Sequence, residues 1–524
     1  MEKGNSRFGR FWQRPLSAYL PVLIVLAAGL LFLLVFFFTQ MHLFLHIYED
    51  TVVAPSCGAH GYTLHTCRLC GDSYTDTVTY TDHAYTAPYT VRDPSDSTLG
   101  ISTSYCIHCG DVKRTEIPMT IPIPVVYLEG NLPPDKENPT IISISYRSST
   151  TAFKTTAQAR IQGLTSAGFP KKNYNLRFYT DDTLQQKNKV DLGYGAWGDQ
   201  WKYTLKANYI DRSHARNIVC CRIFSQMVET RATPNRDLLN APNNGVTDGF
   251  PVRVYHNGQY HGLYTMNIAK DKWMFGIDEQ THPYSAIITA QMHSVSNRFQ
   301  QTTDLANTVD WDLEYCSTGE DIAWVNKSFN DFISFVINTT DVVTFRARAH
   351  EYMDVEAVID YIWMYTLAYG TDNAHKNVIF VTYDGKHWIP NYYDGDSSFG
   401  LHWDGRSFYS NADLDAYLPR TVTINSAINN NYLHSRVAYC FYDEFVARYW
   451  ELRETVISNE NIIATFQGFF DSVPTSAYQE DRKKWSLPNP VDEAGNFNDI
   501  GQIRYYVNRH MPLLDNAVRN LVRR

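Results

Sequence analysis

Three acidic side chains and one amide lie close together in the sequence between residues 372 and 396, and their types and spacing suit chemistry. Asp372 is followed five residues later by Asn377, and Asp394 is separated from Asp396 by a single glycine. A carboxylate such as Asp372 can orient or deprotonate an attacking hydroxyl. The amide oxygen of Asn377 and the paired carboxylates are hard ligands that suit Mg²⁺. The stretch therefore predicts a site where a hydroxyl is activated beside a divalent cation.

The elements that must position these residues can be recognised in the same stretch. An apolar segment, a polar loop and two strand-like runs follow one another, at residues 362–370, 371–377, 378–383 and 386–393. Protein kinases have the same order of catalytic loop, hairpin and metal-binding aspartate. Here Asp372 lacks a preceding His-Arg, and Asp394 is not followed by Phe-Gly. The alternative interpretation is a surface hairpin whose Asp and Asn side chains only stabilise turns.

Length and charge limit the classes of function. A chain of 524 residues suggests two or more domains with ample core. The formal net charge is −9, and no block of Lys and Arg stands out. We therefore expect no nucleic-acid partner.

The N-terminal region predicts a membrane anchor. Charged residues do not occur between Pro15 and Tyr48, and residues 21–38 form a solid apolar run, which suits one membrane-spanning helix at residues 15–41. The positive-inside rule then places residues 1–14 in the cytoplasm and the rest of the chain outside. The basic residues behind this orientation are Lys3, Arg7, Arg10 and Arg14. A cleaved signal peptide is the alternative, but the run is long for one and no A-x-A-like site follows.

Residues 42–116 contain an internal repeat with metal-ligand spacing. Segments 51–72 and 90–111 align without gaps, and each ends in a C-x-x-C knuckle and is preceded by His-x-Tyr. Such a knuckle places two thiolates on one metal, and a distant His and Cys can complete a tetrahedron. The expected structural-zinc ligands are His46, Cys57, Cys67 and Cys70 in the first copy, and His83, Cys106 and Cys109 in the second.

Three points stay open for this module. Asp96 stands in the second copy where Cys57 stands in the first, which puts metal binding by that copy in doubt. An outside location also permits disulfides in place of zinc. His46 lies close to the apolar helix and can instead be an interfacial residue. The phrase from Gly61 to Thr77 resembles small Cys/His ribbon repeats of Gram-positive surface proteins.

Residues 117–524 predict one large domain after a proline-rich linker at residues 117–124. A hairpin is expected around the turn at Asn257-Gly258, and a helix through Met227 is expected to begin after Asp211 or Ser213. Cys220 and Cys221 on that helix are interpreted as core residues. Further strands are expected at residues 122–128, 140–146, 155–161 and 201–208. Residues 280–350 are expected to be an insertion with two short helices and no site.

A glycine-containing loop at residues 162–168 precedes Lys171 and Lys172. Such a loop between two strands can cover phosphates, with a lysine of the second strand reaching them. The alternative is an ordinary hairpin with solvated lysines.

Taken in order, these motifs resemble the CotH family of spore-coat-protein-H-like atypical protein kinases. The resemblance covers residues 118–518 and rests on motifs at residues 169–174, 211–217, 257–264, 372–377 and 394–400. It implies an α+β, atypical protein-kinase-like fold that transfers phosphate from ATP to Ser or Thr of a protein substrate. It further implies that Asp372 is catalytic, that Asn377 and Asp394 or Asp396 bind Mg²⁺, and that Lys172 or Lys171 contacts phosphate.

Two departures from the family pattern keep a second hypothesis open. The loop reads Gln162-Gly163-Leu164-Thr165-Ser166 where the family has GRGNS, and Asn267-Ile268-Ala269 lacks the acidic residue that often follows the hairpin motif. A kinase needs its lysine–glutamate ion pair and its metal-binding aspartate together. The alternative function is therefore a catalytically silent surface binding protein on a kinase-like scaffold.

Overall fold

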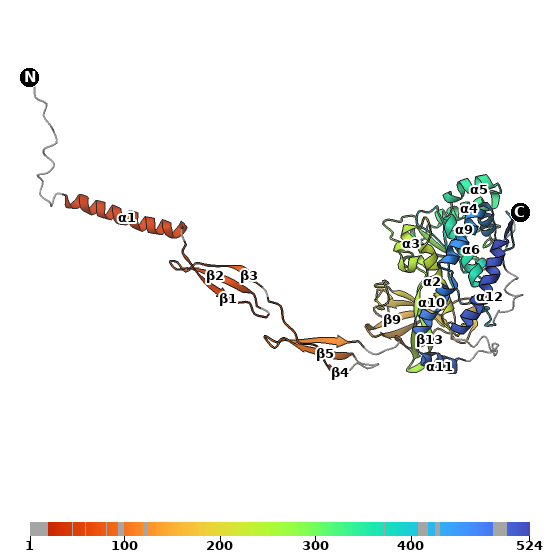
Figure 1. Cartoon of the computed structure of the whole chain (residues 1–524), viewed down its shortest axis with the longest axis horizontal. Helices are drawn as coiled ribbons and strands as arrows, with labels where there is room; N and C mark the ends of the chain where they lie inside the picture. The colour runs from red at the N-terminus through yellow and green to blue at the C-terminus, as the bar shows by residue number, and fades with distance from the viewer. Residues whose placement is uncertain are drawn as a thin grey trace, which may run out of the picture. The chain divides into compact units, whose positions relative to one another are not determined.

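The computed structural model divides the chain into two compact units, Met1–Met119 and Thr120–Arg524 (Figure 1). Within them, the structure describes residues 19–44, 46–57, 59–79, 81–92, 99–118, 123–370, 372–406, 418–424, 430–485 and 500–524. Lys3, Arg7, Arg10, Arg14 and Asp96 lie outside the described residues, so the structure does not bear on their predicted roles.

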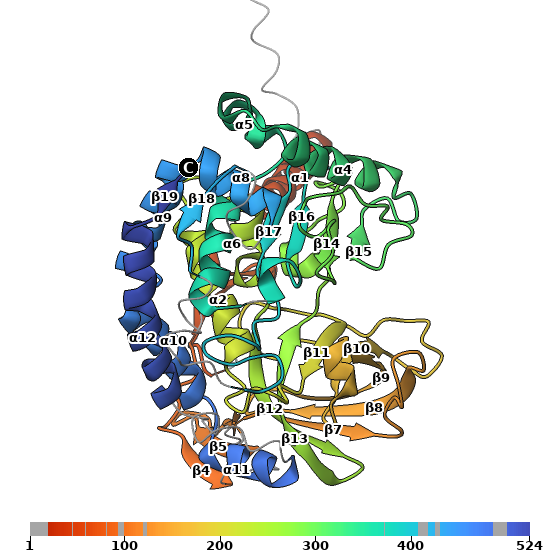
Figure 2. The ribbon, with the colours of Figure 1, turned by 90° about the vertical axis from the view of Figure 1, so that its right-hand side faces the viewer.

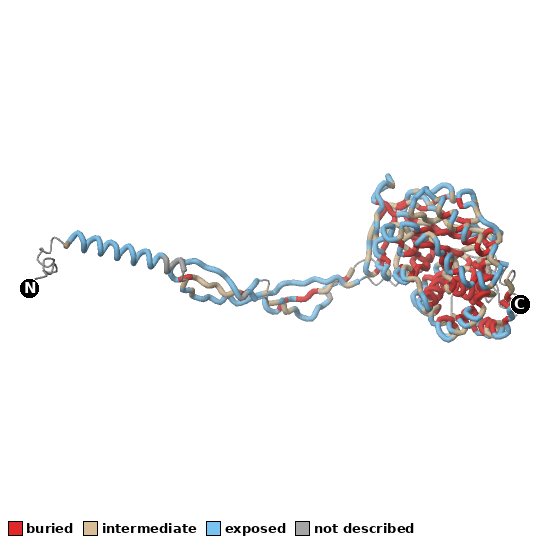
Figure 3. The backbone as a smooth tube through the Cα atoms, turned by 90° about the horizontal axis from the view of Figure 1, so that it is seen from above, coloured by how far each residue is buried: buried red, intermediate tan, exposed pale blue. Residues whose placement is uncertain are grey.

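The first unit begins with one long apolar helix, α1 (Leu20–Phe44). At 1.5 Å per residue its length exceeds the roughly 30 Å hydrocarbon core of a bilayer. The window Leu20–Thr39 has a mean hydropathy of 3.0, and none of it is buried against the rest of the chain (Figure 3). The helix is compatible with a single-pass membrane anchor or with a signal sequence.

Two small antiparallel sheets follow α1, and they give the internal repeat a repeated structure. The first sheet has the order β1-β2-β3 and the second β4-β5-β6. A tight turn closes each C-x-x-C knuckle, since the backbone N–H of Cys67 donates to Asp72 and that of Cys106 to Asp111. Their strands are β1 (Tyr48–Val53), β2 (Gly61–Cys67), β3 (Ser73–Thr79), β4 (Tyr89–Arg92), β5 (Gly100–Tyr105) and β6 (Val112–Ile117).

The second unit contains a closed β-barrel with the strand order β10-β11-β13-β12-β7-β8-β9. Burial alternates along its strands, as in β8, where Ile142, Ile144 and Tyr146 point into the core. The predicted hairpin is confirmed, because β12 and β13 meet at Asn257 and Gly258, both with positive φ. The strands are β7 (Val125–Glu129), β8 (Thr140–Arg147), β9 (Ala152–Gln162), β10 (Asn173–Tyr179), β11 (Lys202–Lys206), β12 (Gly249–His256) and β13 (Gln259–Ile268).

A second, antiparallel sheet with the order β15-β14-β16-β17 forms the other part of this unit together with most of the helices (Figure 2). Its strands are β14 (Ala286–Ala290), β15 (Trp311–Cys316), β16 (Ile379–Thr382) and β17 (Ile389–Asn391). A short parallel pair joins β18 (Thr421–Val422) to β19 (Val522–Arg523). The unit thus mixes helices with mainly antiparallel sheets, as expected for an α+β domain.

The second unit contains a buried helix, α6 (Val355–Ala368), that packs against several others. Glu356 is the one residue of α6 outside the core, because the helix is almost entirely apolar and its buried Asp360 is paired with Arg231 and Arg448. The side chain of Asp354 caps its N-terminus, and Tyr369 ends it in the left-handed conformation. Helices that pack against it are α2 (Arg216–Glu229), α8 (Tyr432–Cys440), α9 (Tyr442–Glu454) and α12 (Ile500–Arg519). Further helices of the unit are α3 (Arg236–Asn240), α4 (Ala323–Asn338), α5 (Val342–Arg348), α10 (Asn459–Asp471) and α11 (Thr475–Lys484). Short 3₁₀ helices are η2 (Thr165–Gly168), η3 (Pro242–Gly245), η4 (Lys272–Phe275), η5 (Ala349–Glu351) and η6 (Asp372–Ala374).

The segment 280–350 differs from its expected organisation. Its two helices, α4 and α5, are confirmed, but it also supplies the strands β14 and β15. Strand β14 pairs with β16 and is buried along its whole length. Its five residues, AIITA, are too few for a local pattern to distinguish a strand from a buried helix segment. Its partner strand β16 lies about 90 positions later in the chain, so the pairing could not be read from the local sequence.

Candidate functional site

A cleft of about 870 Å³ opens between the barrel and the second sheet of the large unit. Asp372, Asn377, Asp394 and Asp396 all line it, although up to 24 positions separate them in the sequence. Lysines and arginines face them from the surrounding elements, namely Lys136, Arg160, Arg177, Lys206, Lys270 and Lys376. Acidic and basic side chains thus share one cavity, an arrangement suited to an anionic ligand that brings its own cation.

Asp372 sits directly after α6, in the short helix η6. Its Oδ1 lies 3.4 Å from Nε2 of His293, and its Oδ2 lies 3.7 Å from Nζ of Lys376. Burial alone would raise the pKa of Asp372, but the hydrogen bond from His293 and the charge of Lys376 hold it below its usual range. The carboxylate is therefore ionised at neutral pH and can accept a proton.

The loop from Asp394 to Gly400 is fixed by the segment before and at the start of α2. Arg216 donates from Nε to the carbonyl oxygen of Ser398 at 2.9 Å and is itself paired with Asp211 at 2.6 Å. Asn217 accepts a 3.2 Å hydrogen bond from the backbone N–H of Gly395. Two motifs far apart in the sequence therefore act together, since one holds the backbone on which the other's carboxylates stand.

Gly395 separates the two aspartates because no larger residue fits there. A Cβ at this position would lie 2.7 Å from Cβ of Cys220, whose side chain is fully buried on α2. Cys220 and Cys221 are both buried core residues, as expected. The close packing of the loop on α2 fixes the position of the backbone that carries Asp394 and Asp396.

The two carboxylates of the D-x-D pair have different environments. Strand β17 ends at Asn391 and Asp394 has a φ of 57°, so the strand alternation that would turn both side chains the same way does not apply. Oδ1 of Asp394 accepts a 2.8 Å hydrogen bond from Nζ of Lys206. Burial and the neighbouring Asp394 raise the pKa of Asp396 to about 7. Two carboxylates this close favour either a shared proton or a bound cation.

Lys171 and Lys172, the two lysines expected to reach phosphate, lie in other surroundings. Nζ of Lys171 is buried and bonded to Asp481 at 2.8 Å and to the carbonyl oxygen of Leu263. Lys172 donates to the carbonyl oxygen of Ala167 at 2.7 Å. Lys171 therefore fixes α11 to the barrel, and the side chain that faces the carboxylates is Lys206 of β11.

The glycine-containing loop between β9 and β10 does line the cleft, with residues 161–166. Gly163 has a φ of 102°, and a Cβ there would lie 2.0 Å from Oγ of Ser166, so glycine is required. Asn173 donates to Oγ of Ser166 and accepts from the backbone N–H of Ala207, next to Lys206. The loop is thereby linked to the end of β11, the strand that carries Lys206.

Residues that the sequence analysis missed complete the cleft. His293 comes from the segment after β14, where no site was expected, and it contacts Asp372. Lys270 forms an ion pair with Glu314 of β15, and both line the cavity. Lys206 was also missed, although its position near the end of the run 201–208 was a usable indication. No local pattern marks His293 or Glu314.

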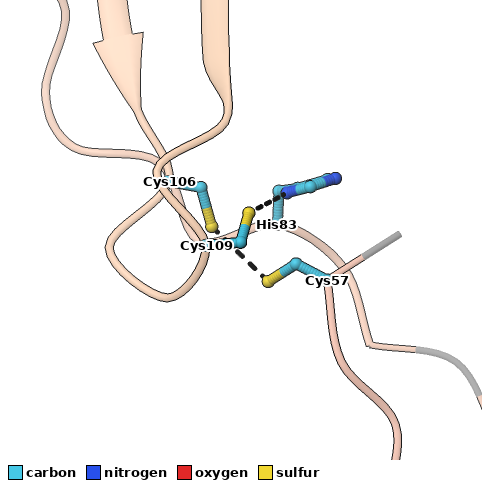
Figure 4. Close-up of side chains that lie close together, drawn as sticks. All are labelled: Cys57, His83, Cys106 and Cys109. Atoms are coloured by element: carbon cyan, nitrogen blue, oxygen red, sulfur yellow. Dashed lines mark hydrogen bonds between the residues drawn. The ribbon is translucent and has the colours of Figure 1, made fainter. Parts of the chain in front are cut away.

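The Cys/His repeats contain two groups of potential ligands, but their membership differs from the expected one. His46 groups with Cys67 and Cys70 in the first copy. Cys57, also from the first copy, instead joins the ligands of the second copy, His83, Cys106 and Cys109 (Figure 4). Burial alone would raise the pKa of Cys106, but hydrogen bonds from backbone N–H groups lower it to about 5.

Comparison with family models shows the protein family to which the large unit belongs. The family model described as CotH kinase protein matches residues 159–511, which include every cleft residue from Arg160 to Trp403. The chain belongs to the CotH family, as its motifs indicated. No curated protein matches the chain.

Proposed function

We propose that the large unit is a protein kinase that transfers the γ-phosphate of ATP to a Ser or Thr hydroxyl of a protein substrate. The observation that carries this proposal is the convergence of Asp372, Asn377, Asp394 and Lys206 on one cleft of about 870 Å³. Phosphoryl transfer requires these parts, namely a carboxylate for the hydroxyl, oxygen ligands for a cation and a lysine for phosphate.

In this proposal Asp372 orients the substrate hydroxyl and accepts its proton. Its lowered pKa keeps it ionised, and the contact with His293 fixes the direction of the carboxylate. His293 does not touch the substrate in this scheme and is a positioning residue. Lys376, 3.7 Å away, limits the rotation of the same carboxylate.

The donor set at Asn377, Asp394 and Asp396 fits Mg²⁺, because it consists of hard oxygen ligands in a partly buried cleft. The raised pKa of Asp396 supports this assignment, since neighbouring carboxylates of this kind are relieved by a cation. When bound, Mg²⁺ would neutralise charge on the transferring phosphate. Asn377 would contribute its amide oxygen from the end of the loop that begins at Asp372.

Lys206 is the residue that we assign to phosphate contact. It stands on a barrel strand, its Nζ already faces the carboxylates, and the loop 162–168 is tied to the same strand. Nearby charges, above all Asp394, overcome the effect of burial and raise the pKa of Lys206, so it stays charged. The surrounding cations Arg160, Arg177 and Lys270 favour a polyanionic ligand such as ATP.

The test is phosphorylation of a protein substrate, or autophosphorylation, by the full chain in detergent with labelled ATP and Mg²⁺. Asp372→Asn should reduce the rate by ~10²–10⁴-fold, as is typical for loss of a general base. Asp331→Asn is the matched control, because Asp331 is an exposed residue of α4 that pairs with Lys327 and does not line the cleft as described. Activity unchanged by Asp372→Asn would remove the catalytic assignment.

A second candidate function is a catalytically silent binding protein on the same scaffold. The observation that favours it is the Lys206–Asp394 ion pair, which occupies one oxygen of the expected metal ligand. Nucleotide binding separates the two candidates, because a bound ligand stabilises the folded state. An unchanged Tm of the full chain at millimolar ATP and Mg²⁺ favours the silent scaffold.

We further propose that α1 anchors the protein in a membrane with the large unit outside the cytoplasm. The support is the apolar helix together with the basic residues that precede it and the acidic Glu49 and Asp50 that follow. Protease added to intact cells should then release a large fragment beginning after residue 49. Complete protection of the chain would reverse the orientation.

A further inference from the structure

The ligand group that joins the two Cys/His repeats is separate from the cleft and carries an inference beyond the proposed kinase function. We propose that Cys57 of the first repeat (residues 46–72) and His83, Cys106 and Cys109 of the second repeat (residues 83–111) bind one tetrahedral Zn²⁺. This ion would link the two repeats. The first repeat would keep a weaker group of its own.

The distances within the group suit a tetrahedron around one ion. Sγ of Cys57 lies 3.5 Å from Sγ of Cys106, and Sγ of Cys109 lies 3.3 Å from Nδ1 of His83. All four ligand atoms lie within 4.8 Å of one another, and Figure 4 shows them converging from two separate parts of the chain. With Zn–S bonds of ~2.3 Å, the edge of a regular tetrahedron measures about 3.8 Å.

The donor atoms select the metal. Three thiolates and one imidazole form a Cys₃His set, which is typical of closed structural zinc sites. Mg²⁺ and Ca²⁺ prefer oxygen ligands, and the group contains none. A tight turn holds Cys106 and Cys109 in one knuckle, since the backbone N–H of Cys106 donates to the carbonyl oxygen of Asp111 and that of Gly110 donates to the carbonyl oxygen of Cys106.

The hairpin of the first repeat explains why Cys57 cannot serve its own knuckle. In the pairing of β1 with β2, Tyr48 faces Cys67 and Val53 faces Tyr62, so His46 lies at the knuckle end and Cys57 at the opposite end. Strand β2 (Gly61–Cys67) lies between the two ends and spans about 20 Å at ~3.3 Å per residue. Cys57 is therefore directed to the next repeat.

The first repeat is left with three ligands in the described part of the chain. Nδ1 of His46 lies 3.4 Å from Sγ of Cys70, and Cys67 completes the group. A three-ligand site keeps an open position and holds its metal less tightly than a closed one. The two repeats should consequently differ in zinc retention, despite their aligned sequences.

The experiment measures zinc per chain in the full-length protein in detergent, by elemental analysis after mild EDTA treatment. About one zinc per chain should remain in the wild type, held by the four-ligand group. Cys57→Ser and Cys106→Ser should each lose this retained zinc, and the double variant should lose no more than either single one. Cys67→Ser should keep it. Cys316→Ser is the matched control, a half-buried cysteine outside the repeats.

Cobalt substitution provides a second readout that does not depend on the serine variants folding. Charge-transfer absorbance from thiolate to Co²⁺ grows with the number of thiolates, so Cys57→His should keep a tetrahedral ion but lower this absorbance by about a third, from three thiolates to two. The proposal is overturned if Cys57→Ser retains zinc as Cys67→Ser does. It is equally overturned if the wild-type protein retains no zinc, or if mass spectrometry finds Cys57 and Cys106 in a disulfide.

Discussion

Nζ of Lys206 lies 2.8 Å from Oδ1 of Asp394, and this contact joins the barrel to the loop after β17. The two residues are 188 positions apart, and each is held by its own scaffold, Lys206 by β11 and Asp394 by the loop packed on α2. The ammonium group of Lys206 on a barrel strand thus pairs with the carboxylate of Asp394, which stands in the loop that follows the second sheet.

Replacing Lys206 of the cleft should have a different effect from replacing Lys172 or Lys171, which lie outside it. Lys206→Met should lower the transfer rate by roughly 10²–10³-fold, as when a preorganised group that stabilises developing charge is removed. Lys172→Met should leave the rate within a few-fold, because Nζ of Lys172 donates to the backbone carbonyl oxygen of Ala167 within its own loop. The measurement is the rate at saturating ATP.

Lys171→Met serves as the structural comparison. It should lower Tm, because the buried carboxylate of Asp481 would lose its cationic partner and keep His214 and the backbone N–H of Leu263, and breaking a buried pair costs about 3–5 kcal/mol. A normal Tm with abolished activity would give Lys171 the phosphate role and remove it from Lys206.

His293 should act through Asp372. His293→Ala removes the hydrogen bond and the charge that hold the pKa of Asp372 down, so the acidic limb of the rate profile should move to higher pH. The rate at neutral pH should fall by about tenfold. His350→Gln, a change at an exposed histidine of η5, is the control. A pH profile identical to that of the wild type would show that His293 does not position Asp372.

The two aspartates of the D-x-D pair should differ in importance. Asp394→Asn should abolish transfer, because Asp394 would be the main Mg²⁺ ligand and is the partner of Lys206. Asp396→Asn should leave a measurable remnant, on the order of the 10–100-fold loss seen when an outer ligand changes. The reverse ranking in parallel assays with varied Mg²⁺ would assign the main role to Asp396.

Buried histidines should make the large unit sensitive to acid. Burial lowers the pKa of His434 to about 3 and that of His510 to about 4. The unfolded chain binds these protons near pH 6.5 and the folded chain does not, so the free energy of unfolding is highest above that pH. It falls as the pH drops, by about 2 kcal/mol per histidine from pH 7 to 5.

Urea unfolding at pH 7 and pH 5 measures this effect. His434→Asn should lower the stability at pH 7, since His434 packs in the core beside Tyr365, but it should reduce the difference between the two pH values. His350→Gln should leave that difference unchanged. An equal pH dependence in wild type and His434→Asn would contradict the assignment.

The sequence by itself determined the local elements and the family. The apolar run predicted α1, and Asn257-Gly258 predicted the β12–β13 hairpin, because backbone conformation and hydrophobic length are local properties. The order of the motifs predicted the CotH family, and Asp372, Asn377 and Asp394 do lie on one cleft. Their short separation in sequence made that convergence visible.

The tertiary structure alone decided the partners. Lys206 rather than Lys171 faces Asp394, His293 contacts Asp372, and Cys57 joins the second repeat. The local sequence does not distinguish a lysine that pairs with the buried Asp481 from one that lines a cleft. The partner of each lysine is set only when strands distant in the sequence pair. Cys57 is the clearest case, because the length of β2, and not the ligand spacing, directs its sulfur to the next repeat.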